Sequence, residues 1–185
     1  MDNFVFDPTL KFADPEKILF AAGLAKGQIL ADLGAGSGFY SMAAGKIVGD
    51  AGQIYAVDIL ETALDHIAAE ARLKGLRNVK TVRADLEQSN SCGDVPSGTV
   101  DAVLFSNITH QVKNQTNLFA EAYRLLKTGG KLLVVDWNDT PGLIGPPANQ
   151  RITANDVNKL AAGTNLKPAG QLPVDIYHYG LMYIK

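Results

Sequence analysis

The stretch "DLGAGSG", Asp32 to Gly38, follows the apolar run "QILADL" and precedes the helical pattern "FYSMAAGKIV". Gly34, Gly36 and Gly38 occupy alternate positions in it. Glycine is needed where the backbone takes a positive φ or where a ligand approaches the backbone closely. A buried strand, a glycine loop and a helix in this order predict a parallel sheet of βαβ units. The loop itself is explained either by a tight turn or by a nucleotide-like ligand lying across it.

The rest of the chain continues this alternation of apolar runs and helical patterns. Strands are predicted at 28–33, 53–59, 78–84, 100–106 and 131–137, and helices at 39–48, 60–75, 115–130 and about 153–162. Gly129 is expected just after the third of these helices, and Thr153 is expected to cap the fourth. The closing runs, 165–172 and 175–184, are too close together for a crossover helix and predict an antiparallel hairpin. We expect one α/β domain over 1–185 with a Rossmann-like, doubly wound sheet, mostly parallel with one antiparallel strand near its edge.

Acidic residues stand at the carboxyl ends of successive predicted strands, where ligands of such sheets bind. Asp58 ends the second strand and is placed to accept hydrogen bonds from ribose hydroxyls. Asp85 follows the third strand and is placed to meet an adenine amino group. An acid at such a position is, taken alone, more often a solvated loop residue or a helix cap. Together with Asp32 and the glycine loop, they favour a nucleotide cofactor.

Composition restricts the class of protein further. The chain has 185 residues, a formal charge of −2 and no dense basic block, which disfavours a nucleic-acid partner. No run approaches 18 apolar residues, so we expect no membrane span, and the first residues lack the features of a signal peptide. The single cysteine, Cys92, fits a reducing compartment, and no Cys/His cluster suggests a metal site. We therefore expect a cytoplasmic protein.

The pattern D-x-G-x-G-x-G resembles motif I of the class I S-adenosylmethionine-dependent methyltransferases. "VDAVLFSNITHQV" (100–112) resembles the family's fourth-strand motif, and "LLKTGGKLLVVD" (125–136) resembles its L-K-P-G-G turn, with Thr128 in place of proline. "PEKIL" (15–19) before the glycine loop is similar to the small bacterial relatives of the ubiquinone-biosynthesis type methyltransferases.

This resemblance implies a seven-stranded sheet in which the last strand lies antiparallel beside the fifth. It also implies S-adenosylmethionine as the cofactor. The residues that the resemblance places around this cofactor are Asp32, Gly34, Ala35, Gly36, Gly38, Asp58, Ile59, Ala84, Asp85, Leu86, Ser106 and Asn107.

The acceptor side offers fewer signals, because methyl transfer by in-line displacement requires no nucleophile from the protein. A general base helps only when the acceptor must lose a proton. His110, just past the fourth strand, and His178, at the start of the reversed strand, are the candidates, and we expect both to face the acceptor cleft. Arg151 is a candidate for an anionic acceptor or a local salt bridge, and Trp137 for a pocket wall or simple packing.

The leading hypothesis is a methyltransferase for a small-molecule acceptor, with O, N and C all open as the methylated atom. Asn107 lacks the Pro-Pro-aromatic sequence of enzymes that methylate nucleic-acid amino groups. The alternatives are a non-catalytic S-adenosylmethionine-binding module and, less favoured by the glycine spacing, a nicotinamide-dependent oxidoreductase. The site is expected to be closed by residues 1–13, by a second subunit in a homodimer, or by a large acceptor.

Overall fold

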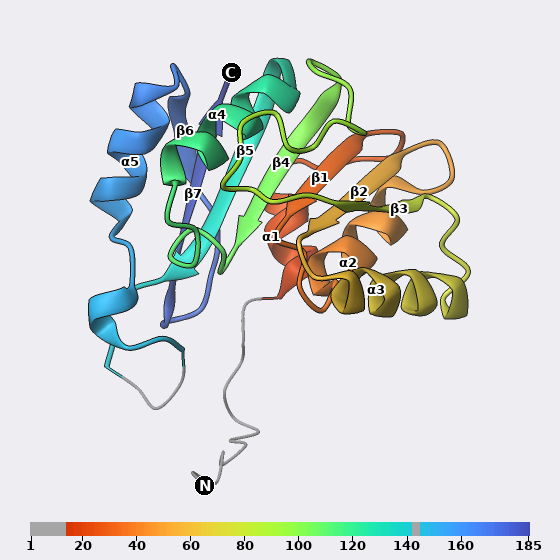
Figure 1. Cartoon of the computed structure of the whole chain (residues 1–185), viewed down its shortest axis with the longest axis horizontal. Coiled ribbons are helices and arrows are strands. Elements are labelled where there is room, and N and C mark those ends of the chain that lie inside the picture. The colour runs from red at the N-terminus through yellow and green to blue at the C-terminus, as the bar shows by residue number, and fades with distance from the viewer. Residues whose placement is uncertain (1–13, 142–144) are drawn as a thin grey trace, which may run out of the picture.

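A seven-stranded sheet organises the computed structural model, which describes residues 14–141 and 145–185 (Figure 1). The strand order is β3-β2-β1-β4-β5-β7-β6. The strands are β1 (Ile29–Leu33), β2 (Gln53–Asp58), β3 (Val79–Arg83), β4 (Val100–Ser106), β5 (Leu126–Trp137), β6 (Lys167–Gln171) and β7 (His178–Ile184). Only β7 runs against its neighbours, pairing antiparallel with both β5 and β6. The predicted fold class, the position of the last strand and the closing hairpin are confirmed.

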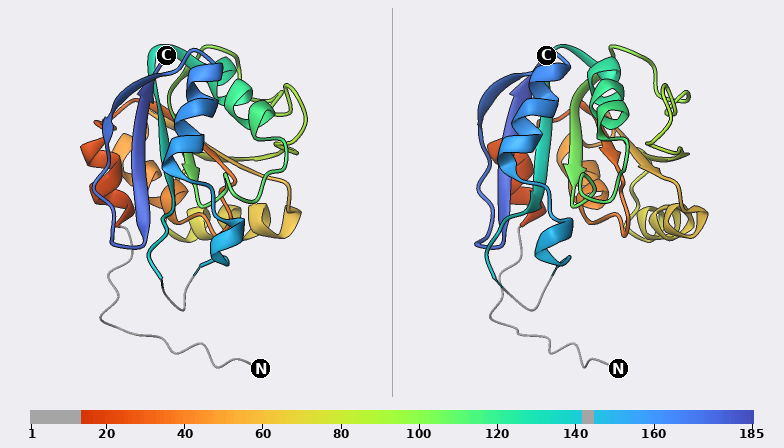
Figure 2. Two further views of the ribbon diagram at one scale, coloured as in Figure 1. Left: turned by 90° about the vertical axis from the view of Figure 1, so that its left-hand side faces the viewer. Right: turned by 60° about the vertical axis from the view of Figure 1, so that its left-hand side comes forward.

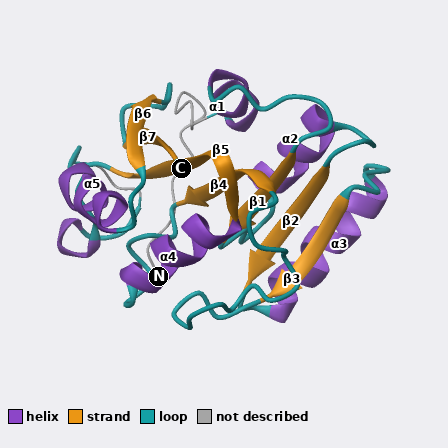
Figure 3. Ribbon diagram, turned by 90° about the horizontal axis from the view of Figure 1, so that it is seen from above, coloured by secondary structure: helices purple, strands orange, loops and turns teal. Residues whose placement is uncertain are grey.

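Helices cover both faces of the sheet (Figures 2 and 3). They are α1 (Pro15–Ala21), α2 (Phe39–Val48), α3 (Glu61–Leu73), α4 (Gln115–Leu125) and α5 (Ala154–Gly163), with a short 3₁₀ turn at Ala148–Gln150. Buried residues of α1 and α2 form one core with the sheet, and those of α4 and α5 form another on the opposite face. We call these the α1 face and the α4/α5 face.

Local signals in the sequence start and stop these helices. The Thr153 hydroxyl oxygen accepts the backbone N–H of Asp156 and caps α5, as predicted. Asp14 caps α1 in the same way, with Pro15 in the first turn. The prediction for Gly129 was wrong, because α4 ends at Leu125 and the chain enters β5 directly. Gly129 instead has a φ of 77° within β5, and its N–H donates to the carbonyl of Lys185.

The side chains of β5 point alternately to the two faces of the sheet, and this alternation sets the face of each residue at the end of the strand. Leu132 and Val134 pack in the core of the α4/α5 face, and Leu133 and Val135 in that of the α1 face. Successive side chains of a strand point to opposite faces. The last two residues of β5, Asp136 and Trp137, therefore belong to the α4/α5 face and the α1 face respectively.

Further expectations from the sequence concern the N-terminal segment, membrane spans and metal sites. The predicted lid, residues 1–13 with Phe4, Phe6 and Phe12, lies outside the described residues. Over 14–141 and 145–185, no helix has the length and apolar character that a membrane crossing requires. Nor does any group of three His, Cys, Asp or Glu side chains within those ranges have an arrangement that could hold a metal ion.

Candidate functional site

The three glycines of the loop between β1 and α2 serve two different purposes. All three have positive φ, with values of 78°, 53° and 80° for Gly34, Gly36 and Gly38. A Cβ at Gly34 would overlap the side chain of Ile108, and a Cβ at Gly38 would lie 2.7 Å from Ile67. A Cβ at Gly36 would instead have the carbonyl oxygen of Gly34 as its nearest neighbour, 4.0 Å away. Gly34 and Gly38 therefore allow close packing, whereas Gly36 leaves the loop open on its outer side.

Asp58, at the end of β2, ties this loop to the next one. One carboxylate oxygen accepts the backbone N–H of Gly36 at 2.9 Å, and the other accepts that of Leu60 at 3.0 Å. The side chain is largely buried. Because each carboxylate oxygen has two lone pairs, both oxygens can still accept further hydrogen bonds. The geometry thus leaves Asp58 able to receive a pair of hydroxyls.

Asp32 lies in β1, just before the glycine loop, and its side chain is buried beneath the loop rather than exposed in it. The carboxylate is 1% exposed and accepts the Ser41 hydroxyl at 2.7 Å. Burial, reinforced by the nearby charge of Asp58, raises the pKa of Asp32 to about 6. Asp32 therefore fixes the first turn of α2 at an electrostatic cost.

The remaining residues of the predicted cofactor site lie along the same edge. Ala84 and Leu86 are buried, whereas Ile59 is 52% exposed beside Asp58. Asp85 is half-buried and accepts the backbone N–H of Glu87 at 3.0 Å, so it caps its own turn. Ala35 packs against the small core that α2 and α3 form over β2.

The loop after β4 carries the first predicted catalytic histidine. Its Nδ1 lies 2.9 Å from Oδ1 of Asp136, and the His110 side chain is 9% exposed. Asp136 is fully buried and also accepts the backbone N–H groups of Thr109 and Trp137, at 3.1 and 2.9 Å. Asn107 takes a φ of 55° at the head of this loop.

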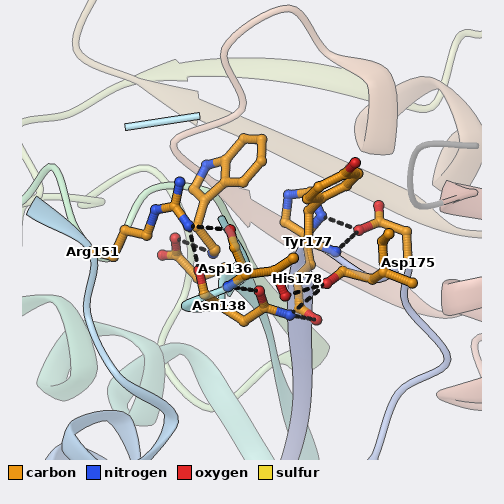
Figure 4. Close-up of polar contacts among 9 residues, drawn as sticks. Asp136, Asn138, Arg151, Asp175, Tyr177 and His178 are labelled. Carbon is orange, nitrogen blue, oxygen red and sulfur yellow. Dashed lines mark hydrogen bonds and ion pairs between the residues drawn. The ribbon is translucent and has the colours of Figure 1, made fainter. Parts of the chain in front are cut away.

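The second predicted histidine is held in a similar way. Nδ1 of His178 lies 2.7 Å from Oδ1 of Asp175, which also accepts the backbone N–H of Tyr177 (Figure 4). The indole ring of Trp137 stacks on the imidazole with 4.2 Å between ring centroids. Both His178 and Asp175 are almost entirely buried.

The structure does not bring the two imidazoles together. His110 is bound to Asp136 on the α4/α5 face, and His178 stacks on Trp137, whose register partner it is, on the α1 face. The two histidines therefore flank the end of β5 from opposite sides. An acceptor that contacts both must extend across the end of that strand.

Arg151 braces the loop that lies beyond β5. Its guanidinium donates to the carbonyls of Asn138, Thr140 and Pro146 (Figure 4). It also lies over the indole of Trp137, 5.9 Å from the ring centroid. These contacts hold the loop around Trp137. The sequence alone suggests a different role for Arg151, namely binding an anionic acceptor or forming a local salt bridge.

A family model described as a methyltransferase domain matches residues 31–134, more than half of the chain. The chain belongs to the class I S-adenosylmethionine-dependent methyltransferases. S-adenosylmethionine is the cofactor of this family, and the residues present fit it. The open side of Gly36 leaves room for a ligand, and Asp58 can still accept hydrogen bonds. Phe39, Ile59 and Leu60 offer exposed apolar surface beside them.

Relatives of this methyltransferase agree on the fold. A S-adenosylmethionine-dependent methyltransferase from Aquifex aeolicus superposes with a TM-score of 0.86 at 26% identity, over 96% of this chain and 93% of that one. The ubiquinone/menaquinone biosynthesis C-methyltransferase UbiE of Haemophilus ducreyi is 31% identical over 118 residues, and that of an Escherichia coli strain is 30% identical over the same length. These matches cover 63% of this chain but only 44% and 45% of the two UbiE proteins, so the chain spans less than half of their length.

Three residues of this methyltransferase were absent from the predicted site. Asp136 holds His110, Asp175 holds His178, and Tyr40 lies buried on the α1 face, the face of His178. A signal for Asp136 was present, since it is another acid at the carboxyl end of a strand. Asp175 stands three residues before His178, which indicates a local pairing. Tyr40 carried no such signal, because it reads as an ordinary inward-facing residue of α2.

Proposed function

We propose that the protein transfers a methyl group from S-adenosylmethionine to a hydroxyl-bearing small molecule, with His110 as the general base. The observation that carries the proposal is the hydrogen bond of 2.9 Å between His110 and the buried Asp136 at the carboxyl edge of the sheet. The same edge carries the glycine loop and Asp58. A base and a cofactor loop on one sheet edge are the two parts that such a transfer needs.

The contact with Asp136 fixes which ring nitrogen of His110 carries the proton. A carboxylate only accepts hydrogen bonds, so the imidazole donates its Nδ1–H to Asp136. In the neutral ring the lone pair is then on Nε2, which is the atom that can take a proton. When it does, the positive charge that forms lies beside the buried Asp136 carboxylate and is stabilised by it. Asp136 acts as a positioning residue in this proposal.

The proposed chemistry balances with one proton transfer. S-adenosylmethionine supplies a methyl group on a sulfonium, and loss of that group leaves a neutral thioether. His110 Nε2 takes the hydroxyl proton of the acceptor. Deprotonation makes the acceptor oxygen nucleophilic. In a phenol it also makes the ring carbon ortho to the hydroxyl nucleophilic. Both O-methylation and C-methylation are thus served by the same base, and the name of the UbiE relatives as C-methyltransferases is compatible with the second.

The cofactor half of the edge completes the proposal. The open side of Gly36 and the carboxylate of Asp58 would hold the cofactor, with apolar walls at Ile59 and Leu86. On the acceptor side, Trp137 and the loop braced by Arg151 would form part of the wall of the acceptor site. A second copy of the chain that covers the acceptor remains part of this proposal.

The test is an acceptor screen with methyl-labelled S-adenosylmethionine over phenols, alcohols, thiols and amines, with mass spectrometry to assign the methylated atom. His110→Ala should lower the turnover of a hydroxyl acceptor by about 10²–10⁴-fold, because a general base contributes about that much. His66→Ala removes the histidine of α3, which lies in the hollow beside Gly38 and Phe39 rather than at Asp136, and serves as the control for loss of an imidazole.

Transfer at an undiminished rate by His110→Ala would contradict the role of His110. Binding of S-adenosylmethionine without transfer to any acceptor would instead favour the non-catalytic binding module.

A further inference from the structure

Buried polar atoms without a hydrogen-bond partner are concentrated at one part of the molecule. The described residues contain six such side-chain atoms, on Tyr40, Asn78, Asn107, Thr109, Asp175 and His178. All except Asn78 lie at the carboxyl edge, either directly after β4, at the start of β7 or in the first turn of α2. Most buried polar groups of a folded protein are paired, because an unpaired one costs about 1–3 kcal/mol. Five at one edge therefore indicate a surface that a ligand completes.

Three of these atoms belong to the α1 face. They are the Tyr40 hydroxyl, Oδ2 of Asp175 and Nε2 of His178, and each side chain is more than nine-tenths buried. Burial raises the pKa of the Tyr40 hydroxyl, the nearby Ser106 side chain lowers it, and the carboxylates of Asp32, Asp175 and Asp14 raise it further. Tyr40 and Asp175 are therefore close enough to interact electrostatically. No hydrogen bond of adequate geometry joins Tyr40 to Ser106. We call Tyr40, Asp175 and His178 the α1-face cluster.

The chemistry of the α1-face cluster is that of a hydrogen-bond acceptor. Oδ2 of Asp175 can only accept, and in the neutral ring of His178, with its Nδ1–H directed to Asp175, Nε2 accepts as well. Among the ion pairs of the described residues, the only one that Asp175 makes is with His178, and Asp32 makes none. Buried carboxylates that lack a cationic partner favour a positively charged ligand.

Tyr40 lies in the first turn of α2, directly after the glycine loop, but the position of Asp175 and His178 assigns the cluster to the acceptor. Asp175 and His178 lie at β7, and β4 and β5 separate β7 from β1, which carries the glycine loop. Three strand spacings of about 4.8 Å place the two ends roughly 14 Å apart. His178 stacks on Trp137 and is thus at the end of β5, across from His110 and Asp136.

We infer that the α1-face cluster binds a protonated amino group of the acceptor. The hydroxyl of the same acceptor molecule then faces His110 on the other side of β5. This inference rests on the proposed function and narrows the acceptor class to hydroxylated amines. A primary ammonium group donates three hydrogen bonds and is about as large as a water molecule, so it needs little space beside Tyr40, Asp175 and His178. Trp137, which lies against His178 at the end of β5, supplies an aromatic wall beside the amino end of the acceptor.

The experiment compares tyramine with 4-ethylphenol, which has the same ring and hydroxyl but no amino group. Each compound is titrated calorimetrically into protein saturated with S-adenosylhomocysteine. Tyramine should bind at least about tenfold more tightly, since its ammonium meets a charged acceptor. Asp175→Asn should reduce this preference to less than about threefold, and Asp94→Asn, at an exposed loop position, should leave it unchanged.

A second variant keeps the test informative if Asp175→Asn does not fold. Tyr40→Phe removes only the unpaired hydroxyl and should also lower the preference for tyramine. Equal or undetectable binding of the two compounds by the wild type would overturn the inference. So would a loss in Asp175→Asn that appears in the affinity for S-adenosylhomocysteine, because the cluster would then belong to the cofactor.

These outcomes separate the inference from the proposed function. A preference for tyramine without any methyl transfer would leave the amine site standing and remove the proposed reaction. Turnover of phenols without an amine preference would do the reverse.

Discussion

The two halves of the sheet edge differ in how they use their polar groups. At the ends of β1, β2 and β3, the acids bond to the chain itself: Asp58 to Gly36 and Leu60, and Asp32 to Ser41. At the ends of β4 and β7, buried polar atoms of four residues remain unpaired. The first half is a self-supporting loop scaffold that leaves room for the cofactor. The second half is costly to maintain without a ligand, which is why we place the acceptor there.

The largest expected effect comes from closing the open side of the glycine loop. Gly36→Val should weaken S-adenosylmethionine binding by about 100-fold or more, equal to about 3 kcal/mol, because a branched side chain would occupy the ligand's space. The domain should still fold, since nothing in the loop blocks the new side chain and only the positive φ of 53° is strained. Calorimetry and circular dichroism together check both statements.

Gly34→Ala is the matched control for that variant. Its new methyl group would overlap Ile108, so the principal loss should be in melting temperature. Normal cofactor binding by Gly36→Val would remove our distinction between the two glycines.

A smaller effect is expected from the acid that links the two cofactor loops. Asp58→Ala should weaken cofactor binding by about 1.5–3 kcal/mol, because charge-assisted hydrogen bonds to the ligand are lost together with those to Gly36 and Leu60. Asp85→Ala should cost about 0.5–1.5 kcal/mol, as expected for one hydrogen bond. The loss of cofactor affinity is measured by titration for both variants. Equal losses would show that Asp58 contributes no more to cofactor binding than Asp85 does.

A further prediction tests the first half of the edge through stability, without any ligand. The pKa of Asp32 is raised by burial from 3.8 to about 6. The folded protein therefore keeps this proton to higher pH than the unfolded chain does, and stability falls as the pH rises from about 4 to 6. Asp32→Asn avoids this cost and should be stabilised relative to the wild type by up to about 3 kcal/mol more at pH 8 than at pH 4. Urea unfolding at both pH values measures the difference.

The same stability difference at pH 4 and pH 8 would contradict the raised pKa. The Ser41 hydroxyl can still donate to the Asn amide oxygen, so that hydrogen bond is not expected to obscure the result.

Much of the fold was predictable because each element carries its own periodic signal. The run at 100–106 matches β4 residue for residue, and "FYSMAAGKIV" matches α2. The error at Gly129 arose because a glycine with positive φ is typical of a helix end but serves equally well inside an irregular strand. The closing hairpin followed from chain length alone, since no crossover helix fits between 172 and 175.

The site was predictable only where its residues follow strands directly. Asp58 and His110 could be placed on the edge from sequence, because parallel strands end on the same side. Their partners required the register: that Trp137 lies opposite His178 depends on how β5 and β7 pair, which no local pattern encodes. The separation of His110 and His178 onto two faces follows from the same register and from the alternation along β5.

The central claim is that cofactor and acceptor occupy different halves of this edge. One calorimetric titration of S-adenosylhomocysteine into Asp58→Ala and His110→Ala tests it directly. The account predicts that Asp58→Ala loses affinity by roughly 10–150-fold, the equivalent of the loss given above, while His110→Ala stays within about twofold of the wild type. An equal loss in both variants would contradict the account, because the cofactor would then extend across the acceptor half.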